Sequence, residues 1–120
     1  MNMKLNEYNR ILELAGQAVL TEESDEQKLF RQVIQAKAVN ITKKLLKHPK
    51  VNPAANNNWA IRYSSFYGYD TIVELLLKDP RIDPTANDND AIKLASEHGH
   101  TEIVKLLKKA IKERNAAKTK

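Results

Sequence analysis

The sequence contains no cysteine, which excludes disulfide frameworks, thiolate metal sites and cysteine nucleophiles. It also lacks a long apolar run: nothing approaches the roughly 20 residues of a membrane-spanning helix, and the N-terminal stretch has no signal-peptide core. We therefore expect a cytoplasmic protein, in the cell that makes it or in a host cell, without membrane contact.

Motifs that carry chemistry are also missing. There is no glycine-rich phosphate loop, no serine elbow and no pair of carboxylates in an apolar setting. His98 and His100 lie near Glu97, but residues two apart on a helix point to different sides, and no third ligand is spaced to join them. We therefore expect no catalytic site, no cofactor and no metal ion, and hence no enzyme.

The net charge of +5 is distributed unevenly. Residues 105–120 carry seven cations and one anion, a sum of +6, so the other 104 residues sum to −1. A general nucleic-acid binder is more often basic along a whole face. The chain instead resembles a charge dipole, and nucleic acid is not the expected partner.

One stretch of the sequence occurs twice. Residues 51–78 and 82–109 align with an offset of 31 residues and no gap, and 13 of the 28 paired positions are identical. A worn earlier copy is visible where residues 41–51 align with 72–82. A fixed period of this size predicts a stacked repeat protein, because a single pair of short helices cannot bury its apolar face alone.

Local signals predict the elements of each unit. Ser24 followed by Gln27 fits a capping box at a helix start, and Gly68 and Gly99 are placed for turns between paired helices. The periodicity predicts helices at 4–19, 25–38, 41–47, 59–67, 71–78, 90–98 and 101–114.

These elements divide a single domain of residues 1–120 into parts. We predict an N-terminal capping helix in 1–20, a degenerate repeat in 21–50, a repeat in 51–81, a C-terminal capping repeat in 82–114 and a frayed tail in 115–120.

Residues 60–77 and 91–107, in which Ala-Ile opens a helix and Gly precedes an Ile-Val and leucine-pair helix, resemble ankyrin repeats. The resemblance implies an all-α fold, a short ankyrin-like helix-pair solenoid with capping helices at both ends. It also implies a protein–protein interaction module. The family's Thr-Pro-Leu-His opening is absent, so its hydroxyl cap and histidine bonds between repeats are expected to be missing. Asn58 or Asp90 could cap instead.

The two clear copies differ most in their aromatic content. Trp59, Tyr63, Phe66, Tyr67 and Tyr69 crowd into one helix and turn, whereas the last copy has polar residues at most of these positions. Core packing therefore does not require most of them, although Trp59 and Tyr63 could pack against neighbouring repeats. By the resemblance, Phe66 and Tyr67 lie on the recognition groove.

We accordingly predict a small adaptor or inhibitor, favoured as a monomer, that binds another protein through this groove. The expected contact residues are Trp59, Arg62, Tyr63, Phe66, Tyr67, Glu97 and His98, with Asn56, Asn57, Asn87 and Asp88 from the loops.

A stripe of lysines supplies the competing interpretation. Lys105, Lys108, Lys109 and Lys112 recur at three- and four-residue steps along the last helix. They could form a solvated helix end, or a patch that binds nucleic acid or an acidic surface.

Overall fold

The computed structural model describes residues 23–118, which form six α-helices and no strand within that range. The helices are α2 (Asp25–Gln35), α3 (Val39–Leu45), α4 (Ala55–Tyr67), α5 (Asp70–Leu77), α6 (Ala86–Glu97) and α7 (Thr101–Lys118). The prediction of an all-α fold is confirmed. The predicted capping helix at 4–19 lies outside the described residues.

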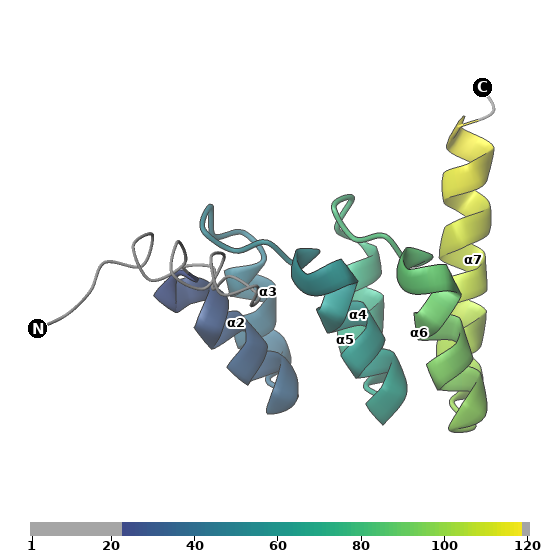
Figure 1. The fold of residues 1–120 in the computed structure, drawn as a ribbon, viewed down its shortest axis with the longest axis horizontal. Helices are drawn as coiled ribbons and strands as arrows, with labels where there is room; N and C mark the ends of the chain where they lie inside the picture. Colours follow the sequence, from purple (N-terminus) through teal and green to yellow (C-terminus); the bar gives the residue numbers. More distant parts are fainter. Residues whose placement is uncertain (1–22, 119–120) are drawn as a thin grey trace, which may run out of the picture.

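The helices stack as three pairs in two layers (Figure 1). Helices α2, α4 and α6 form the inner layer, and α3, α5 and α7 form the outer layer, with α5 in contact with both α3 and α7. The loops that connect one pair to the next project from the same end of the stack (Figure 1). This is the predicted helix-pair solenoid.

A continuous core lies between the layers. Residues of the same register are buried in successive units, as with Ile72 and Ile103 or Leu76 and Leu107, all fully buried. Small residues at Ala60 and Ala91 are buried where α4 and α6 pack closely. The 31-residue period therefore reports the spacing at which the same packing position recurs.

The two turn glycines have positive φ, +76° at Gly68 and +73° at Gly99, as the turn prediction requires. A Cβ atom on Gly68 would lie 2.6 Å from the His100 ring. His100 Nε2 in turn forms a hydrogen bond with the Phe66 carbonyl at 3.0 Å. A histidine bond between repeats therefore exists here, contrary to expectation, although it comes from the turn and not from the helix opening.

Both loops enter their next helix through a left-handed turn. Asn56, Asn57 and Asn58 have φ of 57°, 55° and 60°, and residues 87–89 repeat this conformation, so the right-handed part of α4 begins at Trp59. Asn and Asp tolerate positive φ better than other non-glycine residues. This accounts for the loop's lack of the glycine turn that the family usually has.

Asn57 allows the cost of this backbone conformation to be measured, because its side chain is exposed and makes no hydrogen bond in the described part of the chain. We expect Asn57→Val to lower the free energy of unfolding by about 1–2 kcal/mol, since a β-branched residue would be held at positive φ. Asn57→Gly is the control and should be neutral or stabilising. Urea unfolding followed by circular dichroism measures both, and equal losses would refute the backbone explanation.

Amide side chains at one register join successive units. The Ser24 hydroxyl accepts a hydrogen bond from the Gln27 backbone N–H at 3.0 Å, which confirms half of the capping box. The Gln27 side chain does not complete it. It binds both backbone groups of Asn52, donating to the carbonyl at 2.9 Å and accepting from the N–H at 2.7 Å.

Asn58, which is 31 residues after Gln27, accepts a hydrogen bond from the Asp83 N–H at 2.8 Å. It links its unit to the following loop, so the prediction that it caps the helix is wrong. Asn89 is the third residue of this register, and in the last described unit it is exposed. The register is therefore a link between units that has no successor at the end of the stack.

Asn89 offers a matched control for this link, because both residues have left-handed backbones. We expect Asn58→Ala to lower the free energy of unfolding by about 1 kcal/mol more than Asn89→Ala, the difference being the lost hydrogen bond. Chemical denaturation of the two variants measures it. If the two losses are the same, the amide link contributes nothing to stability.

Two arginines donate hydrogen bonds to backbone carbonyls of the preceding loop and helix end. Arg81 donates to the carbonyls of Leu46, at 2.7 Å, and Val51, at 3.0 Å. Arg114 donates to the carbonyls of Leu77, at 3.1 Å, and Ile82, which have the same two registers one unit later. Arg114 follows Arg81 by 33 residues instead of 31, because α7 continues as a helix where the earlier units form a loop.

Helix α7 extends beyond the other helices (Figure 1) and ends at Lys118, four residues past the predicted end at Arg114. Of the tail expected to fray, residues 115–118 are helical and 119–120 lie outside the described part. Ala116 and Ala117 are strong helix formers, and Arg114 holds this segment to the preceding loop. The rest of the proposed division into repeats stays a prediction.

Candidate functional site

Five rings form a continuous cluster along α4 and its turn. The Trp59 and Tyr63 ring centroids lie 4.7 Å apart, and those of Tyr63 and Tyr67 lie 4.6 Å apart. Phe66 is 4.7 Å from Tyr67, and Tyr69 is 5.9 Å from Tyr67. The shared face that the four-residue spacing predicts is present. We call these five residues the aromatic cluster.

The burial of the side chains differs across the aromatic cluster. Trp59, Tyr63 and Tyr69 pack against the buried core, whereas the Tyr67 side of the cluster faces solvent and Tyr67 is 51% exposed. Burial raises the pKa of the Tyr63 phenol, and the nearby Tyr67 and Tyr69 add to the shift, so this phenol stays neutral. Lys37 places its Nζ 5.4 Å from the Tyr69 ring centroid, a cation–π arrangement.

His98 extends the cluster onto the next inner helix. Its ring lies 4.3 Å from that of Phe66, and its Nδ1 forms a hydrogen bond with the Leu94 carbonyl at 2.9 Å. Glu97 is exposed beside it. The structure therefore brings Phe66, Tyr67 and His98 together from two units.

Arg62 is more occupied than the sequence suggested. Its guanidinium donates to the carbonyls of Asn57, at 3.0 Å, and Asn56, at 3.1 Å, and to the carboxylate of Asp90 at 3.1 Å. It thus fixes a left-handed turn and links two units. Asp90, expected as a helix cap, is instead the partner of this arginine.

The predicted loop residues Asn56, Asn57, Asn87 and Asp88 are all exposed, on the turns at the start of α4 and α6. Phe66 and Tyr67 lie at the opposite end of α4, roughly 15 Å away at 1.5 Å per helical residue. The eleven predicted contact residues therefore fall into a loop-side group and a turn-side group. Only a partner that spans the inner helices could contact both.

The predicted basic residues Lys105, Lys108, Lys109 and Lys112 are exposed on α7. Within the described residues, Lys105 alone of these four has an ion pair, with Glu102 at 3.4 Å. The stripe therefore lies on the solvent-exposed surface of α7, a helix of the outer layer that packs on α5 and α6.

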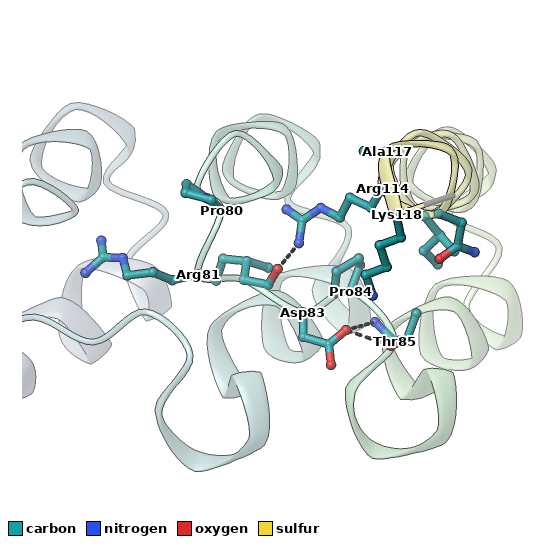
Figure 2. A pocket seen from close by; sticks show the side chains of 11 residues that line it. Pro80, Arg81, Asp83, Pro84, Thr85, Arg114, Ala117 and Lys118 are labelled. Atoms are coloured by element: carbon teal, nitrogen blue, oxygen red, sulfur yellow. Dashed lines mark hydrogen bonds between the residues drawn. The ribbon is translucent and has the colours of Figure 1, made fainter. Parts of the chain in front are cut away.

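A hollow of about 470 Å³ lies between α7 and the loop of residues 80–85 (Figure 2). Pro84 and Ile111 line it, Lys118 and Arg114 stand on its α7 side, and Asp83 faces it from the loop. Sequence reasoning missed this hollow because it forms only when α7 continues past the position where earlier units turn into a loop. The Ile at position 111, where Pro80 stood one unit earlier, was the available signal.

The described residues contain no group of three or more His, Asp or Glu that could hold a metal ion. Across residues 23–118, no helix is both long and apolar enough to cross a membrane.

Comparison with known protein families settles the classification. A family model described as ankyrin repeats in three copies matches residues 29–119. The chain belongs to the ankyrin repeat family. Searches of curated proteins and of solved structures returned no significant match. Ankyrin repeats are in general protein–protein interaction modules, and an ankyrin domain alone is typically non-catalytic.

Asp79, in the loop between two ankyrin repeats, is a carboxylate whose pKa lies below its usual range. Asp79 accepts bonds from the Arg81 N–H and guanidinium, the shortest at 2.7 Å, and these bonds lower its pKa. Because the folded pKa lies below the unfolded value of about 3.9, the stabilisation is present above that value and is lost as pH falls through the folded pKa.

We therefore expect Asp79→Asn to weaken the fold at neutral pH and to flatten its loss of stability below about pH 5. Urea midpoints at neutral and acidic pH measure the slope. Asp88→Asn, an exposed carboxylate in a left-handed turn, is the control and should keep the slope of the unmodified chain. Parallel slopes for Asp79→Asn and the unmodified chain would contradict the role given to this ion pair.

Proposed function

We propose that this ankyrin repeat protein binds a partner protein across its inner helices, with Phe66, Tyr67 and His98 at the centre of contact. The observation that carries the proposal is the exposed end of the aromatic cluster. Tyr67 is 51% exposed although its ring contacts those of Tyr63, Phe66 and Tyr69, and its counterpart one unit later is a histidine. Stacking gives a preformed apolar surface that loses little side-chain entropy on binding.

The remaining predicted contact residues take supporting roles. Trp59 and Tyr63 hold the exposed rings in place from the core side, and Arg62 shapes the neighbouring turn. Glu97 offers a polar contact beside the exposed rings, and the loop residues Asn56, Asn57, Asn87 and Asp88 offer further polar contacts at the other end of the inner helices.

The mechanism is surface complementarity on a rigid scaffold. A module of this size that covers part of a partner would act as a small adaptor or inhibitor in the cytoplasm, and we propose that it does so as a monomer. The proposed partner is a protein that offers apolar side chains to the aromatic cluster and polar groups to the loop residues, and that is long enough to span the inner helices.

The double variant Phe66→Ala/Tyr67→Ala tests the surface. Truncating a central contact typically costs about 2 kcal/mol, so we expect capture of the partner to weaken roughly 30-fold or more. The measurement is affinity capture from the source or host cell with mass spectrometry, followed by titration of the partner so identified.

The control is Thr71→Ala/Glu74→Ala on the exposed side of α5, which should leave capture unchanged. Circular dichroism checks that both variants fold. Full capture by a folded Phe66→Ala/Tyr67→Ala variant would show that the aromatic cluster is not the binding surface.

The competing proposal is an electrostatic binder of nucleic acid or an acidic surface, acting through Lys105, Lys108, Lys109 and Lys112. Their exposure on α7 favours it. Its signature is an affinity that falls steeply with salt concentration, whereas contact through the aromatic cluster depends weakly on salt.

A further inference from the structure

Lysine occupies one exposed register in all three helix pairs. The spacing is 31 residues: Lys47 follows α3, Lys78 follows α5, and Lys109 lies within α7. These three helices are neighbours in the outer layer. Each of the three side chains is exposed. Because the units stack in register, the three lysines form a row along the stack.

Further exposed lysines lie at the two ends of this row, on α3 and on α7. Lys43 and Lys44 on α3 join Lys47 and Asn40 around a hollow of about 450 Å³. On α7, Lys105, Lys108 and Lys112 surround Lys109. We call the lysine face the eight exposed lysines Lys43, Lys44, Lys47, Lys78, Lys105, Lys108, Lys109 and Lys112.

Few carboxylates oppose this charge. Through residue 113, the three outer helices contain four: Asp70, Glu74, Glu102 and Glu113. Asp70 and Glu102 lie in first turns, where the helix dipole favours an anion. Among the described residues, the pair of Lys105 with Glu102 is the single ion pair that involves the lysine face.

The fold does not account for the row. Lys47 and Lys78 follow helix ends, where a cation favours the dipole, but Lys109 lies in the middle of α7, where that explanation fails. The arginines of the described residues behave differently. Each of Arg31, Arg62, Arg81 and Arg114 is bonded within the stack. Arg62, Arg81 and Arg114 thus join different units, whereas Lys47, Lys78 and Lys109 have no ion pair among the described residues.

We propose that the lysine face binds an acidic, extended polypeptide segment of a partner protein. Packed helices lie roughly 8–10 Å apart, and an extended chain rises about 3.3 Å per residue, so a carboxylate at every third residue would match the row. This surface lies on the outer layer and does not depend on the aromatic cluster.

The side chains favour an acidic polypeptide over nucleic acid. Single-stranded nucleic acid is bound by stacking on aromatic side chains, and bases are read most often by arginine. Helices α3 and α5 contain neither residue type, and Arg114 of α7 is bound to backbone carbonyls. Lysine ammonium groups are point charges without a fixed geometry, and they pair with carboxylates on a flexible chain.

The experiment uses a fluorescent peptide of twelve residues with glutamate at every third position, titrated with the full chain by anisotropy at low and moderate salt. We expect Lys47→Gln/Lys78→Gln/Lys109→Gln to weaken binding roughly tenfold, as the loss of three exposed charge pairs would. The control Lys28→Gln/Lys93→Gln/Lys118→Gln removes the same charge elsewhere, and it should change affinity less than about twofold.

The control lysines are exposed on α2, on α6 and at the end of α7, nine residues from Lys109 and so on the opposite side of that helix. Equal weakening by the two triple variants would overturn the proposal, because net charge alone would then explain binding. Stronger binding of RNA, DNA or anionic vesicles of matched charge through the same three lysines would also overturn the assignment to a polypeptide. The double variant Lys47→Gln/Lys78→Gln, expected to lose part of the affinity, repeats the test with fewer changes.

Discussion

The stack depends on hydrogen bonds through which one unit satisfies the backbone of the next. Gln27 and Asn58 bind the backbone of the following loop, and Arg81 and Arg114 bind carbonyls of the preceding one. The loops are irregular, so their N–H and C=O groups would otherwise lack partners wherever packing excludes water. Apolar burial drives the units together, and these bonds fix the register in which they meet.

The period of the sequence predicted the fold because stacking imposes the same demand on each unit. Ile72 and Ile103 are alike because both fill the same position in the core, and the helix pairs and glycine turns follow from such positions. What sequence reasoning missed depends on partners that are distant along the chain. Asparagine is a common helix cap, but the Asn58 side chain accepts its hydrogen bond from Asp83, whose position depends on the stacking of the next unit. Similarly, a run of Asn and Asp indicates a turn but not a left-handed one.

In the candidate site, too, contacts within one helix were predictable from the sequence and contacts between units were not. Spacing predicted the contact among Trp59, Tyr63 and Tyr67, because helical neighbours four residues apart meet whatever surrounds them. It did not predict that Arg62 would be held by a turn and by Asp90, since that requires two units to be placed. Nor did it predict the hollow beside α7. The local geometry of the site was thus predictable, and its connections across units were not.

The division of labour between the two basic residue types links stability to function. Arginine presents several donors in a rigid plane, so it can bridge carbonyls of different loops, as Arg114 does with Leu77 and Ile82. Lysine has a single flexible ammonium group and gains little from such a position. A stack whose arginines are bonded internally can therefore vary its surface lysines at little cost in stability. The helix dipole explains the cations at Lys47 and Lys78 but not the one at Lys109, so the repeated row makes the outer layer a second candidate binding surface beside the aromatic cluster.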